Sequence, residues 1–413
     1  MLSIPARIFS GIKVTDNNSE DRQTIPPAQR YVLLKYLGHE CNGTINLSRD
    51  VKTEDLVAIK TVLHNDSNTL PPEVAILQHI GPHENIVQLL NCFGHPSMED
   101  WTRIVFEHCE IGDLHEYSFQ MGDTPPPEPF LWHIKSEISR GLEFIHSKNV
   151  VHGDLKLSNV LLRHPPGLDP ESQSSRPRFP VLRIADFGNS VLKPRSDIPQ
   201  SHLSTWCYCA PESGEYFGPE TDIWALGCII HQLVHRKFPY IHVPSAEYQP
   251  EDEKAYESSD WSNDLKEFHI YLRTRTFAPT RLDQPTPRSM PRSKLLQYFM
   301  MRTLETDHKK RITASELCRY VPTIAHLIRK IVPKDKARPV TYMSTKQYRP
   351  ILASFDDNEG ATDSSVVREI FCAFMEYVAM YEQGWLFLHV AQLLPLLDKE
   401  DEKIATEVVR RLS

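Results

Sequence analysis

The sequence contains no apolar run that approaches the roughly 20 residues needed for a membrane-spanning helix, because charged residues interrupt its longest hydrophobic stretches. It also lacks an excess of positive charge: 46 Lys and Arg residues stand against 54 Asp and Glu residues, which gives a formal net charge of −8. This balance creates no basic field that would attract nucleic acid or an anionic membrane. We therefore expect no membrane partner and no nucleic-acid partner.

The eight cysteines lack the paired C-x-x-C spacing that is typical of structural zinc sites. Scattered thiols without such pairing are typical of proteins in a reducing compartment. The cysteine pattern therefore argues against a zinc site and favours a location in the cytoplasm, the nucleus or both.

The distribution of strand-like and helix-like patterns along the 413 residues predicts two lobes and an appendage. Short β-branched segments at 30–37, 44–48 and 56–62 predict a small β-rich lobe. From residue 131 onward, apolar residues mostly recur at helical spacing, which predicts a larger helical lobe. Three Pro-rich or polar segments interrupt this pattern and predict surface loops: 164–180, 251–292 and 333–362.

The most informative block is His152–Asn159, which reads H-G-D-L-K-L-S-N and is followed by Asp186-Phe187-Gly188. An Asp, a Lys two residues later, an Asn three further on and a second Asp downstream can position a hydroxyl, hold a transferring phosphate and bind two metal ions. These motifs resemble the catalytic loop and the metal-binding motif of the eukaryotic protein kinase family. Gly153 makes this the H-G-D variant of a loop in which many members carry arginine.

The resemblance implies a role for each polar residue of these motifs. Asp154 would accept or orient the proton of the substrate hydroxyl, and Lys156 would neutralise the transferring phosphoryl group. Asn159 and Asp186 would each bind a Mg²⁺ ion. The lysine in D-L-K-x-x-N is similar to that of the serine/threonine kinases. At Gly153, the family's arginine normally receives an activation-loop phosphate, so control through that contact is not expected.

Upstream blocks match the nucleotide-binding part of the same family. Val57-Ala58-Ile59-Lys60 resembles the strand whose lysine holds the phosphates, and Glu73 resembles the helix glutamate that pairs with this lysine. Residues 37–45 resemble the glycine-rich loop, with Glu40 in place of its second glycine. A carboxylate near a triphosphate is repulsive, so Glu40 either turns to solvent or weakens nucleotide binding.

The resemblance also implies a purine slot, in which apolar side chains sandwich the ring and hinge backbone groups bind its edge. Phe106 matches the gatekeeper position, and Glu107 and Cys109 match the hinge positions whose backbone groups contact the purine. The residues implied to bind ATP are Gly38, Gly43, Ile45, Ala58, Lys60, Phe106, Glu107, Cys109 and Leu161.

A third group of residues resembles the platform on which kinases bind protein substrates. The resemblance implies an ion pair between Glu212, in Ala210-Pro211-Glu212, and Arg311, and it implies that Thr205 bonds toward the catalytic Asp and Lys. Residues 205–209 are partly similar to the T-x-W-Y-R motif of cyclin-dependent and related kinases, but Cys209 replaces the arginine. Kinases of small molecules generally lack this platform, so a protein substrate is favoured.

We expect an α+β, two-lobed kinase domain over residues 30–325, with the N-lobe at about 30–108 and the C-lobe at about 109–325. Residues 1–29 are expected to form a disordered tail. Residues 326–413 are expected to form a linker and a helical C-terminal extension, whose apolar face around Phe371 and Phe374 is a candidate site for a regulatory partner. The expected function is ATP- and Mg²⁺-dependent serine/threonine phosphorylation; the alternative is a pseudokinase or docking module.

Overall fold

The computed structural model describes residues 27–40, 43–64, 69–95, 98–122, 125–165, 179–192, 205–242, 271–272, 275–282 and 292–331. Outside these residues lie most of the expected N-terminal tail, the expected loop at 333–362 and the predicted C-terminal helices. The predicted binding of a regulatory partner to those helices therefore also falls outside the described residues. No helix in the described part of the chain is long and apolar enough to cross a membrane.

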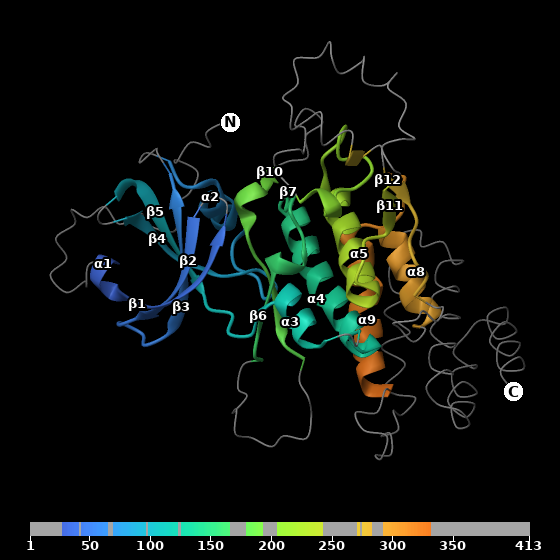
Figure 1. Ribbon diagram of the computed structural model, residues 1–413, viewed down its shortest axis with the longest axis horizontal. Coiled ribbons are helices and arrows are strands. Elements are labelled where there is room, and N and C mark those ends of the chain that lie inside the picture. The colour runs from blue at the N-terminus through green and yellow to red at the C-terminus, as the bar shows by residue number, and fades with distance from the viewer. Residues whose placement is uncertain are drawn as a thin grey trace, which may run out of the picture.

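The N-lobe is a five-stranded antiparallel sheet with one helix against it (Figure 1). Its strands are β1 (Tyr31–Glu40), β2 (Gly43–Asp50), β3 (Leu56–Leu63), β4 (Leu89–His95) and β5 (Met98–Glu107), in the spatial order β1-β2-β3-β5-β4. Helix α2 (Pro72–Ile80) connects β3 to β4 and begins at a proline, which is tolerated in a first helical turn. The β-rich lobe predicted from β-branched runs is therefore present.

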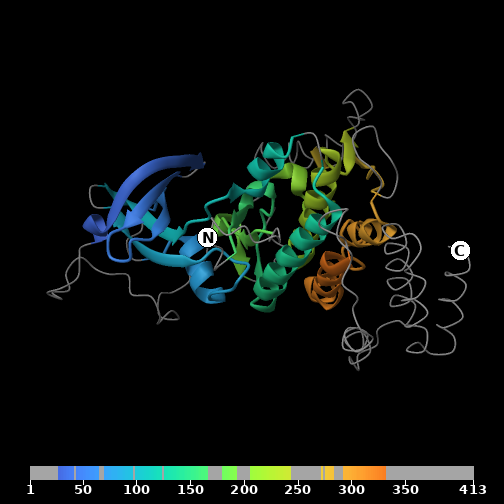
Figure 2. The same cartoon turned by 90° about the horizontal axis from the view of Figure 1, so that it is seen from below.

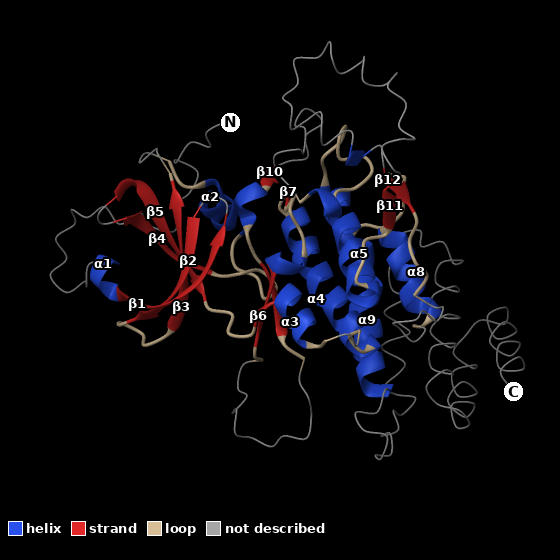
Figure 3. Ribbon diagram, in the orientation of Figure 1, coloured by secondary structure: helices blue, strands red, loops and turns tan. Residues whose placement is uncertain are grey.

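The C-lobe is mainly helical (Figure 3). Its helices are α3 (Leu114–Gln120), α4 (Glu128–Ser147), α5 (Pro219–His235), α8 (Lys294–Thr303) and α9 (Ala314–Ile331). Its described residues also form three small sheets: β6 (Gly112–Asp113), β8 (Val160–Arg163) and β9 (Val181–Ile184); β7 (Val150–Val151) and β10 (Val191–Leu192); β11 (Tyr240–His242) and β12 (Arg275–Phe277). Figure 2, seen from below, again shows the sheet lobe and the helical lobe side by side.

One large cluster of buried apolar side chains joins the lobes, because it includes residues of α2, β5, α4 and α5 as well as α8 and α9. A smaller cluster of Tyr31, Val57, Ile59, Phe93 and Val105 fills the other side of the N-lobe sheet. The predicted two-lobed α+β fold is confirmed.

In three places the structure has helix or strand where the sequence pattern indicated a tail, a linker or a loop. Helix α1 (Pro27–Arg30) occupies the end of the expected tail, where Arg30 is tied to Asp50 of β2 by an ion pair of 2.5 Å. Helix α9 continues to Ile331, past the expected domain end at 325. Part of the expected loop 251–292 is strand β12, which the sequence pattern missed because a three-residue strand shows no periodicity.

Lys135 of α4 gives a testable consequence of this packing. Its side chain is fully buried, its Nζ donates to the backbone carbonyl of Phe299 in α8 at 3.0 Å, and burial lowers its pKa to about 7. An unfolded lysine keeps its proton up to about pH 10.4. Between these values the unfolded state binds more protons than the folded state, so the free energy of unfolding should rise with pH.

We expect Lys135→Met to remove this rise. The slope of the unfolding free energy, measured by urea denaturation between about pH 7.5 and 9.5, should fall by up to about 1.4 kcal/mol per pH unit relative to wild type. The exposed Lys309→Met is the matched control and should keep the wild-type slope. Parallel curves for wild type and Lys135→Met would contradict the burial of an ionisable ammonium.

Candidate active site

Lys60, Glu73 and Asp186 meet where the two lobes face each other. The Lys60 ammonium of β3 lies 3.0 Å from the Glu73 carboxylate of α2 and 2.9 Å from the Asp186 carboxylate. Burial alone would raise the pKa of Asp186, but the charge and hydrogen bond of Lys60 outweigh it and hold this pKa below its usual value. Glu73 also accepts a hydrogen bond from the backbone N–H of Phe187, at 3.2 Å, so one carboxylate connects helix α2 to both the strand and the loop.

Asp154, Lys156 and Thr205 form a second polar group. Lys156 Nζ donates to Asp154 Oδ2 at 2.7 Å and to Thr205 Oγ1 at 3.0 Å. The Thr205 hydroxyl and backbone N–H both donate to Asp154 Oδ1, each at 2.8 Å. The activation segment, residues 186–212, is therefore bonded at Thr205 directly to Asp154, which the resemblance implies as the residue that accepts or orients the substrate proton.

Asn159 connects the two polar groups. Its Nδ2 donates to the Asp154 carbonyl at 2.8 Å, and its own carbonyl accepts from the N–H of Ala185, next to Asp186, at 2.9 Å. The donation by Nδ2 fixes the orientation of the amide. The predicted catalytic and metal-binding residues of both motifs are thus brought into one region of the structure.

The donor set can be compared with the chemistry of Mg²⁺. In the described part of the chain, no three His, Cys, Asp or Glu side chains gather as a metal cage. One carboxylate and one amide, from Asp186 and Asn159, are hard oxygen donors, and Mg²⁺ usually binds through one or two such groups together with substrate phosphates and waters. The residues present therefore fit a Mg²⁺ ion that binds together with a nucleotide.

Asp222 of α5 holds the catalytic loop, in line with the resemblance of Asp222-Ile223-Trp224-Ala225-Leu226-Gly227 to the kinase helix that anchors this loop. Its carboxylate is buried and accepts the backbone N–H groups of His152 and Gly153, each at 2.9 Å. His146 Nε2 of α4 lies 2.9 Å from the same carboxylate. The His152 ring packs edge-on against Phe187 at 4.9 Å. One buried carboxylate thus orients the loop that carries Asp154.

The predicted platform pair is present as a bidentate contact. Arg311 donates from its two terminal nitrogens to the Glu212 carboxylate at 2.5 and 2.9 Å. The Arg311 guanidinium is fully buried and lies 5.1 Å from the centre of the Trp224 ring. Such a pair is costly to break from one side because the remaining charge stays buried.

Most residues predicted for the nucleotide site lie on β1, β2, β3 and β5 of the N-lobe sheet, whereas Cys109 follows β5 and Leu161 lies on β8 of the C-lobe. Ala58 and Phe106 are opposite each other in the pairing of β3 with β5, and Ile45 is opposite Lys60 in the pairing of β2 with β3. Ala58, Ile45 and Leu161 are half-buried, as the walls of an apolar slot should be.

Gly38 lies within β1, opposite Ile45 of β2, and Gly43 is the first residue of β2, opposite Glu40. At Gly43 a Cβ would lie 2.0 Å from the carbonyl oxygen of Thr61, so this glycine is required by close approach of the strands, independently of any phosphate. Around Gly38 there is open space, so a Cβ there would meet nothing within 4 Å. The side chain of Glu40 lies outside the described residues.

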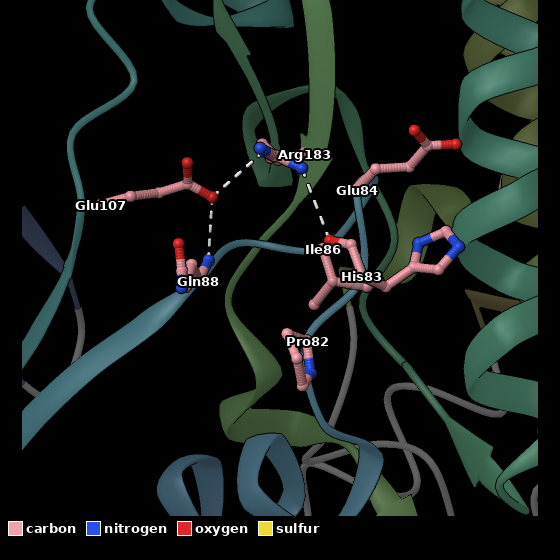
Figure 4. A pocket seen from close by; sticks show the side chains of 7 residues that line it. All are labelled: Pro82, His83, Glu84, Ile86, Gln88, Glu107 and Arg183. Carbon is pink, nitrogen blue, oxygen red and sulfur yellow. Dashed lines mark hydrogen bonds and ion pairs between the residues drawn. The ribbon is translucent and has the colours of Figure 1, made fainter.

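The side chain of Glu107 contacts two arginines and a backbone N–H that lie far from it in the sequence, and the sequence did not predict these contacts. It lines a cavity of about 310 Å³ together with Pro82, His83, Glu84, Ile86, Gln88 and Arg183 (Figure 4). There it pairs with Arg163 at 2.5 Å and with Arg183 at 3.1 Å, and it accepts the N–H of Gln88 at 2.9 Å.

The backbone N–H of Glu107 also donates to the carbonyl of Gln88, at 3.0 Å. The backbone N–H of Glu107 therefore already has a partner, and the predicted contact with a purine would be made by the backbone carbonyl of Glu107. Its charged side chain instead ties the hinge to β8 and β9.

A family model of the protein kinase domain matches residues 31–321 of the chain. The chain belongs to the protein kinase family. Similar curated proteins include the serine/threonine-protein kinases unc-51 of Caenorhabditis elegans (30% identical, over 67% of this chain and 29% of that protein), ULK1 of Homo sapiens (27%, over 68% and 24%) and ppk25 of Schizosaccharomyces pombe (27%, over 58% and 56%). The chain spans about half the length of ppk25 and less than a third of the other two.

Gly153 is the position where this kinase departs from the usual arginine, and the structure gives it a steric reason. Its φ is +81°, and a Cβ would lie 2.8 Å from the Phe217 ring and 3.0 Å from the carbonyl oxygen of Asn189. Phe217 is completely buried, so it has little room to move.

We expect Gly153→Ala to lower the free energy of unfolding by about 2 kcal/mol and Gly153→Arg to lower it further, because both meet the positive φ and the Phe217 ring. Urea denaturation measures both. Gly94→Ala is the matched control, since Gly94 is exposed, has no positive φ and would bring its Cβ within 4 Å of nothing. A Gly153→Arg variant as stable as wild type would contradict this account.

Proposed function

We propose that this protein is a serine/threonine kinase that transfers the γ-phosphoryl group of ATP, with Mg²⁺, to hydroxyl groups of protein substrates. The observation that carries the proposal is the hydrogen-bonded group of Asp154, Lys156 and Thr205 beside the Lys60–Glu73–Asp186 ion pairs. These are the parts that phosphoryl transfer needs: a group to orient the hydroxyl, a cation at the moving phosphate and a carboxylate for metal.

In this proposal each residue acts through its position. Asp154 accepts a hydrogen bond from the substrate hydroxyl and orients its oxygen toward the phosphate. Lys156, 2.7 Å from Asp154 Oδ2, places a positive charge where negative charge develops. Lys60, already paired with Glu73, holds the phosphates of the nucleotide. Bound at Asn159 and Asp186, Mg²⁺ would neutralise phosphate charge.

The Glu212–Arg311 pair supports a protein as the substrate, because it braces a surface that kinases of small molecules generally lack. The six cysteines of the described residues form no disulfide with one another, which supports a reducing compartment, cytoplasmic or nuclear. The alternative is a pseudokinase or docking module, because a Glu40 carboxylate that faced the phosphates would weaken nucleotide binding.

Asp154→Asn tests the proposal because it keeps the size of the side chain while removing its charge. We expect phosphate transfer to a basic protein to fall by about 10²–10⁴-fold, while nucleotide affinity measured by calorimetry stays near the wild-type value. The exposed Asp55→Asn is the control and should retain full activity. Activity of Asp154→Asn above about a tenth of wild type would rule out the assigned role.

A second test concerns the activation segment. Gly153 offers no guanidinium to bind a phosphate, and Thr205 is already bonded to Asp154 and Lys156, so we expect no need for activating phosphorylation. Of the other hydroxyls, Ser190 donates to the carbonyl of His152, whereas Ser196, Ser201 and Ser204 lie outside the described residues.

Protein made in a host without cognate kinases and treated with phosphatase should transfer phosphate at the rate of untreated protein. The measurement is the initial rate on a basic protein before and after treatment. A large loss that preincubation with ATP reverses would show that a phosphate is needed and would overturn the prediction.

A further inference from the structure

Strands β11 and β12 pair antiparallel, and this β11–β12 strand pair lies against the part of the activation segment that follows Thr205. This part begins with a single 3₁₀ turn, η5 (Trp206–Tyr208). Arg275 of β12 donates from Nη2 to the backbone carbonyl of Cys209 at 2.8 Å. The Tyr240 hydroxyl of β11 donates to the backbone carbonyl of Cys207. The backbone carbonyls of Cys207 and Cys209 therefore both accept hydrogen bonds from the β11–β12 strand pair.

The Arg275 guanidinium is itself held by aromatic rings. It lies 4.7 Å from the centre of the Tyr240 ring and 5.7 Å from that of Tyr271. None of the described carboxylates pairs with it. A guanidinium between two rings keeps a fixed direction, and hydrogen bonds from a charged donor are roughly twice as strong as neutral ones. The contact to Cys209 is thus the main polar contact of a positioned cation.

Apolar contacts cover the same segment. The Tyr271 and Trp206 rings lie 5.6 Å apart, and Leu272 packs against the buried Cys209. Along the chain, Thr205 is bonded to Asp154, and Glu212 is bonded to Arg311. Between them, the carbonyls of residues 207 and 209 are bonded to the β11–β12 strand pair. This strand pair therefore holds the residues between the contact with the catalytic loop and the buried ion pair.

We propose that Arg275 is a positioning residue for the protein substrate. By fixing the carbonyl of the buried Cys209, it sets the backbone of the segment between Thr205 and Glu212. The half-buried Trp206 and Cys207 and the exposed Pro211 of this segment would then form the surface that the substrate chain beside the acceptor hydroxyl contacts. The sequence has Cys209 where the T-x-W-Y-R pattern has arginine, and the backbone carbonyl of this residue is bonded by the guanidinium of Arg275 from β12. This inference rests on the proposed kinase function.

The test compares Arg275→Gln and Arg275→Lys with wild type in steady-state phosphorylation of a peptide substrate selected from a library. Arg275→Gln should raise the KM for the peptide about tenfold, the effect of losing one hydrogen bond from a charged donor, while the KM for ATP stays within about twofold. Arg275→Lys keeps the charge and should recover part of the loss. The matched control is Arg140→Gln on α4, a surface arginine paired with Glu84, which should leave both KM values unchanged.

An unchanged peptide KM in Arg275→Gln, with active wild type, overturns the inference and leaves the kinase function standing. Equal changes in both KM values together with a lower melting temperature also overturn it, because they indicate general loss of structure. If wild type transfers no phosphate, the kinase function fails, and amide hydrogen exchange decides about Arg275. Faster exchange in Arg275→Gln confined to peptides covering 205–212 would support the positioning role, whereas no change or a uniform change would overturn it.

Discussion

The Lys60 ammonium, held between the carboxylates of Glu73 and Asp186, is the interaction on which the relation of the two lobes depends. Removing three charged groups from water is costly, and the cost is offset only when each charge has a close partner. This requirement fixes helix α2 against β3 and draws the Asp186 loop toward both. Asp186 itself has a φ of +63°, an uncommon conformation for a residue other than glycine. Such strain persists only where surrounding contacts over-determine it, here the ion pair with Lys60 and the bond from Phe187 N–H to Glu73.

Below this centre, a second buried carboxylate plays the corresponding role for the catalytic loop. Asp222 accepts two successive backbone N–H groups, of His152 and Gly153, and so satisfies donors that a buried loop could not otherwise satisfy. Because Asp222 lies on α5 within the apolar core, its two hydrogen bonds fix the position of the catalytic loop relative to that helix. The polar groups that would do chemistry, Asp154 and Lys156, therefore lie on a loop whose backbone N–H groups at His152 and Gly153 are both bonded to Asp222.

A short, fixed spacing in the sequence places Asp154, Lys156 and Asn159 on one loop, and the structure brings their side chains together. The strands around Ala58 and the helices α4, α5 and α8 were also predictable, because apolar periodicity reflects burial. Contacts between residues distant in sequence were not. Glu107 meets Arg163 and Arg183 only after β8 and β9 have packed behind the hinge. Arg275 lies in a segment whose Pro-rich, charged composition indicated a loop, and nothing local shows that it reaches Cys209.

Gly153 connects these observations. An arginine at this position would hold the activation segment through a phosphate, so that order would depend on a modification. Here Phe217 occupies the space beside Gly153, and the segment is held through Thr205, through backbone carbonyls and through Glu212. Backbone carbonyls are present in every copy of the chain and need no enzyme to create them. At residue 153 there is thus no space for a side chain that could bind a phosphate, and the described residues 205–212 are instead held by contacts that form when the C-lobe folds.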